Sequence, residues 1–163
     1  MVILGIDPGY ATVGYGVVQY ADGRFRTIDY GAITTPPDKP FADRLDMIYD
    51  CMNELIDTHR PDYMSIEELF FNTNITTGIA VSHARGVILL AATRRGVPYK
   101  EYTPLQVKQS VVGYGRAEKK QVMLMTQTML GLSKLPRPDD AADALALAIC
   151  LAHSHSSRLE ELQ

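Results

Sequence analysis

Hydrophobic residues in the first 35 positions cluster or alternate in the manner of buried strands. The run from Val2 to Ile6 is almost wholly apolar, and residues 13–18 continue the pattern after the turn sequence DPGYAT. Short apolar runs separated by Pro and Gly predict strands joined by a tight turn. Residues 24–35 repeat the pattern. This part of the chain therefore predicts three sequential strands in a hairpin meander.

Helical and strand patterns alternate along the remainder. Apolar residues recur every three or four positions at 41–59, which predicts an amphipathic helix. Short strands are predicted at 62–69 and 97–104, with a long helix at 76–96 between them. Further helices are predicted at 103–113, 117–130 and 139–153. This order predicts an α/β fold with a five-stranded mixed sheet flanked by helices on both faces.

The long helix at 76–96 is apolar on nearly every side between Gly86 and Ala92. A helix that is apolar all round must bury two faces, and its own sheet can cover only one of them. The small residues Gly86, Ala91 and Ala92 permit close helix approach. The segment HARGVILLAATRRG therefore presents a second apolar face that something other than its own sheet must cover.

Length and composition limit the classes of protein to which this chain can belong. With 163 residues, the chain has the length of one domain. We expect no signal peptide, and no apolar run reaches the length needed to span a membrane. Cys51 and Cys150 lack the spacing of metal ligands, so we expect reduced core thiols in a cytoplasmic protein.

Charge is distributed unevenly along the chain. The net charge is −3, but residues 85–137 contain ten Lys and Arg against two acidic residues. The flanking stretches, 1–84 and 138–163, are both acidic. A basic region beside a carboxylate-rich one indicates a polyanionic partner such as nucleic acid.

Asp7 ends the first predicted strand and is followed at once by Pro-Gly. Two kinds of site use such an aspartate: the phosphate loop of actin-like ATPases and the metal site of ribonuclease-H-type nucleases. A third possibility is a carboxylate that only bonds the turn's own N–H groups. Actin-like ATPases need two domains to enclose a nucleotide, so the length of the chain argues against the first kind.

Three further carboxylates are predicted to join Asp7. Glu67 ends the fourth predicted strand, and neighbouring parallel strands bring such ends together at one edge. Asp140 and Asp143 stand at i and i+3 on the last helix, and therefore on one face, whereas Asp139 suits a capping role. An ordinary acidic helix start is the alternative for the pair. Four converging carboxylates require a cation, and an all-oxygen set favours Mg²⁺ or Mn²⁺ over zinc.

The chain resembles the RuvC family of Holliday-junction resolvases in six segments, which are GIDPG with GYGVV, SIEELFF, ARGV, QVKQSVVGYGRAEKKQV and DDAADALALA. The resemblance extends to about residue 155, so we assign 1–155 to one nuclease domain and expect 156–163 to be a frayed tail. It implies a ribonuclease-H-like fold and a homodimer that cuts four-way DNA junctions by paired symmetric nicks in recombination and repair. It also implies the RuvA–RuvB branch-migration complex as a partner.

The resemblance also assigns functional residues. The family's four metal-binding carboxylates and two basic active-site residues match Asp7, Glu67, Asp140, Asp143, Lys108 and Lys119. The carboxylates would hold two Mg²⁺ ions, for which Mn²⁺ would substitute. The implied chemistry is phosphodiester hydrolysis that leaves 5′-phosphate and 3′-hydroxyl ends. A solvated helix charge is the alternative for each lysine.

Two loops are predicted to contact DNA. The family's stacking aromatic matches Phe70, and we expect one ring of Phe70 and Phe71 to be buried while the other stacks on an unpaired base. The segment GYGRAEKK supplies Tyr114, Arg116 and Lys120 for contact with the DNA backbone.

Two other functions remain open from the sequence. One is a catalytically silent dimer that binds junctions, and the other is a general ribonuclease-H-type nuclease for RNA–DNA hybrids. The intact carboxylates argue against the first. The apolar helix at 76–96, which favours a dimer, argues against the second.

Overall fold

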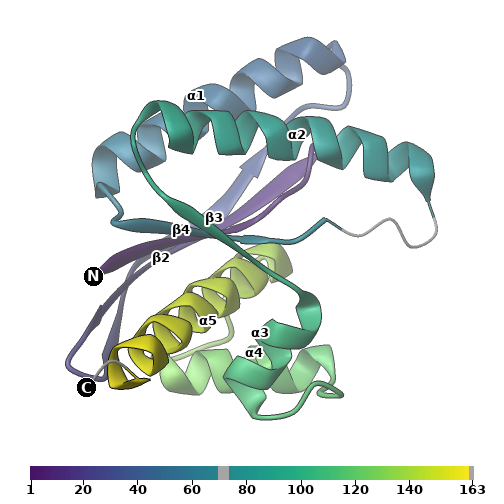
Figure 1. Ribbon diagram of the computed structural model, residues 1–163. Helices are drawn as coiled ribbons and strands as arrows, with labels where there is room; N and C mark the ends of the chain where they lie inside the picture. The colour runs from purple at the N-terminus through teal and green to yellow at the C-terminus, as the bar shows by residue number, and fades with distance from the viewer. Residues whose placement is uncertain (70–73, 162–163) are drawn as a thin grey trace.

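The computed structural model describes residues 1–69 and 74–161, which form a sheet between two layers of helices (Figure 1). The strands are β1 (Val2–Asp7), β2 (Thr12–Ala21), β3 (Arg24–Thr34), β4 (Tyr63–Glu67) and β5 (Tyr99–Tyr102). The helices are α1 (Phe41–His59), α2 (Ile75–Arg94), α3 (Pro104–Val112), α4 (Lys119–Met129) and α5 (Asp139–Glu161). Each predicted element is present, and the α/β class is confirmed.

The sheet is mixed, with the strand order β3-β2-β1-β4-β5. β1, β2 and β3 form an antiparallel meander, whereas β4 and β5 run parallel to β1. In Figure 1, α1 and α2 cover one face, and α5 with α3 and α4 covers the other. The predicted five-stranded sheet with helices on both faces is therefore confirmed.

The register of β1 and β4 places the two candidate strand-end carboxylates side by side. Ile6 pairs with Ile66, so Asp7 and Glu67 are the next residues along their strands. Both isoleucines are fully buried in the core under α1 and α2. Because successive side chains in a strand point to opposite faces, Asp7 and Glu67 project toward the α5 face.

Helix α5 lies against the sheet on that face. Leu145 and Ile149 are fully buried with Ile3 and Val18 from the strands. The buried hydroxyl of Ser65 donates a hydrogen bond of 2.7 Å to the carbonyl of Leu147. This contact joins the middle of α5 to β4, the strand that ends in a candidate site residue.

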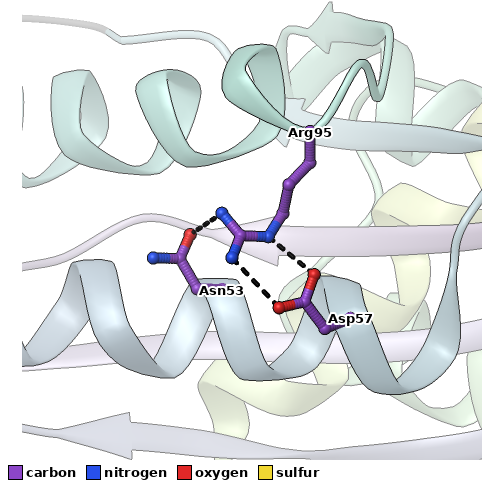
Figure 2. Close-up of polar contacts among 3 residues, drawn as sticks. All are labelled: Asn53, Asp57 and Arg95. Atoms are coloured by element: carbon purple, nitrogen blue, oxygen red, sulfur yellow. Dashed lines mark hydrogen bonds and ion pairs between the residues drawn. The ribbon is translucent and has the colours of Figure 1, made fainter.

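The C-terminal end of α2 is fastened to α1 through one arginine (Figure 2). Arg95 donates two hydrogen bonds to the carboxylate of Asp57, at 2.7 and 3.0 Å, and a third to Asn53. The hydrogen bond from Arg95 holds the pKa of Asp57 below its ordinary value. These contacts hold α1 and α2 together as one layer with a fixed outer face.

The C-terminal segment differs from the expectation of a tail that frays from residue 156, because α5 continues as a helix to Glu161. The Ser156 hydroxyl donates to the Tyr20 hydroxyl at 3.1 Å, and the His155 ring lies 5.6 Å from the Tyr63 ring. Contacts with the sheet therefore support the helix at and just past residue 155, where the family resemblance ends.

Candidate active site

A cavity of about 230 Å³ opens where β1 and β4 end beneath α5. Its polar lining comes from the sheet and from the helices on its α5 face: Asp7 from β1, Glu67 from β4, Lys108 from α3, Lys119 from α4 and Asp143 from α5. Its apolar lining is Pro104, Val107, Val122, Ala146 and Leu147. Five of the six residues predicted for catalysis therefore surround one cavity.

The sixth, Asp140, is half-buried on the first turn of α5 beside the cavity. Its charge and a hydrogen bond with its side chain both act on Asp7. Its neighbour Asp139 instead pairs with Arg137 on the preceding loop. Asp140 and not Asp139 is therefore the residue of this pair whose side chain interacts with Asp7.

Burial and mutual repulsion make the carboxylates difficult to ionise together. Burial, followed by the negative charges of the other three, raises the pKa of Asp7 to about 8. Burial also raises the pKa values of Glu67 and Asp143, with the charge of Asp143 adding to the effect on Glu67. A cation placed among these groups would remove this cost.

Lys119 supplies a positive charge from the protein itself. It is the first residue of α4, and its Nζ donates a hydrogen bond of 3.1 Å to Oδ2 of Asp143. The ammonium opposes the rise in the pKa of both Asp143 and Glu67. Since the lysine side chain is more than half exposed, the same charge is also accessible to a bound phosphate.

The donor set of the site fits a hard divalent cation, because its ligands are carboxylate oxygens. Among the residues that the structure describes, no three Asp, Glu, His or Cys side chains already converge on a point where an ion could sit. Repulsion between like charges accounts for this spacing, as does the contact of Asp143 with Lys119. The carboxylates surround the cavity without forming a closed cage.

The predicted DNA-contact residues outside the cavity lie along the α3–α4 connection. Tyr114 is 46 % exposed there, and the side chains of Arg116 and Lys120 are also exposed. All three are exposed on the segment from the end of α3 to the first turn of α4, the two helices whose lysines line the cavity. Phe70 and Phe71 lie outside the described residues, so the predicted division between a buried and a stacking ring stays a prediction.

Arg85 on α2 is a residue near the site to which the sequence assigned no role. Its side chain is 13 % exposed, its Nε donates to the backbone carbonyl of Glu67 at 3.4 Å, and a terminal nitrogen lies 2.8 Å from Glu101 Oε1. It therefore connects the end of β4 to β5 and α2. Its sequence signals are a cation within an otherwise apolar stretch of helix and its place in the segment ARGV, to which no catalytic or binding role was assigned.

A second cavity, of about 420 Å³, lies between β2, β3 and α1. Its lining includes Asp29 and His59, whose Oδ2 and Nε2 atoms lie 3.3 Å apart, together with Cys51 and Glu54. Among the described residues that line it, none is Lys or Arg. It offers no lysine or arginine to meet a phosphate, so the smaller cavity is the better candidate for nucleic-acid chemistry.

Carboxylates at the ends of adjacent parallel strands, faced by carboxylates on a helix that crosses the mixed sheet, define a nuclease of the ribonuclease-H-like class. The comparisons with known proteins narrow this class. The chain belongs to the RuvC family, because the model for "Crossover junction endodeoxyribonuclease RuvC" matches residues 3–151.

Sequence relatives and solved structures agree with this assignment. The RuvC protein of Ruminiclostridium cellulolyticum is 57 % identical over 155 residues, which are 95 % of this chain and 93 % of that protein. The structure of Thermus thermophilus RuvC in complex with Holliday junction substrate is 37 % identical, with a TM-score of 0.90 over 98 % of this chain and 96 % of that one. The yeast mitochondrial Holliday junction resolvase, at 15 % identity and a TM-score of 0.68 over 94 % of this chain and 78 % of that one, shares the fold.

The pKa of Asp7 predicts a pH dependence for the metal-free protein. The folded state holds a proton up to about pH 8 that the unfolded chain releases near 3.8, so stability decreases as the pH rises between these values. One proton corresponds to a loss of about 1 kcal/mol per pH unit. Thermal denaturation in EDTA from pH 5 to 8 should show this decrease in wild type, and Asp7→Asn should reduce it. Parallel profiles for the two proteins would contradict the assignment.

Proposed function

We propose that this chain is a structure-selective endonuclease that resolves four-way DNA junctions by paired symmetric nicks. The observation that carries the proposal is the cavity in which Asp7, Glu67 and Asp143 meet Lys108 and Lys119. Membership of the RuvC family supports it, as does the likeness to a relative solved with Holliday junction substrate. The role of the enzyme would be in homologous recombination and DNA repair.

The cofactor we propose is Mg²⁺, with two ions per active site and Mn²⁺ as a substitute. The residues that would hold it are Asp7, Glu67, Asp140 and Asp143, whose oxygen donors suit these ions. When bound, the metal supplies Lewis-acid polarisation of the scissile phosphate and activation of the attacking water. The products would carry 5′-phosphate and 3′-hydroxyl ends.

The protein's own cations would position and stabilise the reacting phosphate. Lys108 lines the wall of the cavity on α3, where it would hold the scissile phosphate. Lys119 already donates to Asp143, and it would balance the negative charge that develops at phosphorus in the transition state. Tyr114, Arg116 and Lys120 would contact the flanking backbone, which steers the DNA without selecting its sequence.

Lys119→Ala should reduce cleavage far more than binding, because the charge acts on the transition state. We expect a loss of about 10²-fold in the single-turnover rate and less than about threefold in junction affinity. Lys120→Ala is the matched control, since it removes an adjacent exposed cation and should affect mainly affinity and its salt dependence. Equal losses of cleavage and binding in Lys119→Ala would place it among the general phosphate contacts.

The proposed assembly is a homodimer formed through α2. Ile75, Ile79 and Leu90 on this helix are 72 %, 51 % and 50 % exposed, and a groove of about 410 Å³ runs along it beside Leu45 of α1. An isologous contact would hold two active sites at a fixed separation, as paired cuts in a two-fold symmetric junction require. Contrary to the expectation from the sequence, the helix is long and apolar enough to cross a membrane by length and composition. Its residues Ala84, Ile88, Ala91 and Ala92 are instead buried against the sheet.

The proposed partner beyond DNA is the RuvA–RuvB branch-migration complex, which the family resemblance implies. The proposed compartment is the cytoplasm.

The alternative function, a general nuclease for RNA–DNA hybrids, can be tested by comparing cleavage rates on different substrates. In Mg²⁺, the protein should cut a four-way junction at least about tenfold faster than a duplex or a hybrid of the same sequence. Faster cleavage of the hybrid would favour the alternative.

A further inference from the structure

Helix α5 approaches the sheet more closely than any side chain would permit. A Cβ atom placed on Gly14 of β2 would lie 2.0 Å from the carbonyl oxygen of Asp140. One placed on Gly5 of β1 would lie 1.9 Å from the carbonyl oxygen of Ala144. Both distances fall well below the 3.0 Å that real Cβ contacts require, so these two positions admit only glycine while α5 keeps its place.

These glycines lie directly beneath the turn of α5 that carries the two carboxylates. The carbonyls of Asp140 and Ala144 are four residues apart and therefore one helical turn apart, and Asp143 lies between them. The contacts are with backbone atoms of the helix, which cannot rotate aside as a side chain would. The height of this turn above the sheet is thus set by the absence of side chains at Gly5 and Gly14.

Gly14 also adjoins the carboxylate on the sheet. In the antiparallel register of β1 and β2, Asp7 pairs with Gly14. The same residue therefore contacts the backbone of Asp140 above it and lies opposite Asp7 within the sheet. Gly14 thus contacts the backbone of Asp140 in the helix layer and pairs with the backbone of Asp7 in the sheet.

We infer that Gly14, together with Gly5, is a positioning residue that limits the separation between Asp7 and the α5 carboxylates, and that this separation sets the affinity of the site for a divalent cation. The inference rests on the proposed function, in which these groups hold the metal. A Cβ at residue 14 would have to move the Asp140 carbonyl away by about 1 Å to reach an allowed contact. Metal–oxygen distances tolerate only about 0.2 Å, so the displacement exceeds what the site accepts.

Simple close packing makes a different prediction, which allows a test. If the glycines serve packing alone, Gly14→Ala lowers thermal stability but leaves metal affinity unchanged. If they position the carboxylates, Gly14→Ala also raises the metal concentration that gives half of the maximal increase in melting temperature. The control is Ile149→Val, which weakens the same helix at a fully buried position two turns farther along and leaves the glycine contacts intact.

The measurement is a titration of each protein with Mn²⁺ without DNA, followed by the increase in melting temperature. We expect the half-saturating Mn²⁺ concentration to rise at least tenfold in Gly14→Ala and less than twofold in Ile149→Val. An unchanged value in Gly14→Ala, with a normal response in wild type, would overturn the inference and leave the proposed function standing. No response to Mn²⁺ in wild type would overturn the proposed metal site itself, and the inference with it.

A second variant decides the matter if Gly14→Ala does not fold. Asp140→Glu leaves both glycines and the seated helix in place, and lengthens the carboxylate by one methylene. With the helix height fixed, the longer side chain should misplace its oxygens and raise the half-saturating Mn²⁺ concentration at least tenfold. If Asp140→Glu has the half-saturating Mn²⁺ concentration of the wild type, the separation between the carboxylates is adjustable. That result would contradict the inference that the glycines limit it.

Discussion

Asp7→Asn is expected to abolish junction cleavage, with a loss of at least about 10³-fold in the single-turnover rate. The change removes the carboxylate on which the other three act, and with it several kcal/mol of metal-dependent stabilisation of the transition state. Junction binding should remain equal or become slightly tighter, because one negative charge near the phosphate is lost. Quenched-flow cleavage and gel-shift titration on one junction measure both quantities.

The matched control is Asp139→Asn. It makes the same chemical change on the first turn of α5, but at a residue that pairs with Arg137 and does not line the cavity. We expect near-normal cleavage from it, and losses like that of Asp7→Asn from Glu67→Gln, Asp140→Asn and Asp143→Asn. Retention of more than a few per cent of activity by Asp7→Asn would remove this residue from the metal site.

Leu90→Asp is expected to convert the proposed dimer into soluble, folded monomers that no longer make paired cuts. The side chain is 50 % exposed on the outer face of α2, so an aspartate there is solvated in the monomer and buried without a partner in the dimer. Sedimentation velocity gives the oligomeric state. The ratio of double to single nicks on a supercoiled plasmid bearing a cruciform gives the coupling of the cuts.

Leu124→Asp provides the control for this experiment. Leu124 is an exposed leucine, at 44 %, on α4 at the opposite side of the sheet, so its replacement should leave a functional dimer. Leu89 is a poorer probe than Leu90, because it packs partly against the core under α1 and α2. A Leu90→Asp protein that sediments as a dimer would place the two-fold contact elsewhere.

Local patterns in the sequence predicted much of the fold and the position of the site. Apolar runs that end at Asp7 and Glu67 marked the two strand ends, and the i, i+3 spacing placed Asp140 and Asp143 on one helix face. These are properties of a few consecutive residues, whose periodicity reports which face is buried. The parallel pairing of β1 with β4 then brought the carboxylates to one cavity.

Contacts between distant segments were not predictable in this way. The link from Arg85 to the Glu67 carbonyl and Glu101 depends on how α2 crosses β4 and β5, which periodicity does not encode. The contact of Gly14 with the Asp140 carbonyl likewise depends on the height of a helix 126 residues later in the chain. The extension of α5 to Glu161 follows from contacts with β2 and β4 that the polar tail sequence does not reveal.

The most direct test of the central claim is the metal-dependent cleavage of a mobile four-way junction by the wild-type protein, followed by ligation of the products. With Mg²⁺, the account predicts nicks at symmetric positions in two strands of like polarity, and ends that DNA ligase seals without further processing. With EDTA, it predicts binding without cleavage. Cleavage that persists in EDTA, unpaired cuts by a dimeric protein, or ends that ligase cannot join would contradict it.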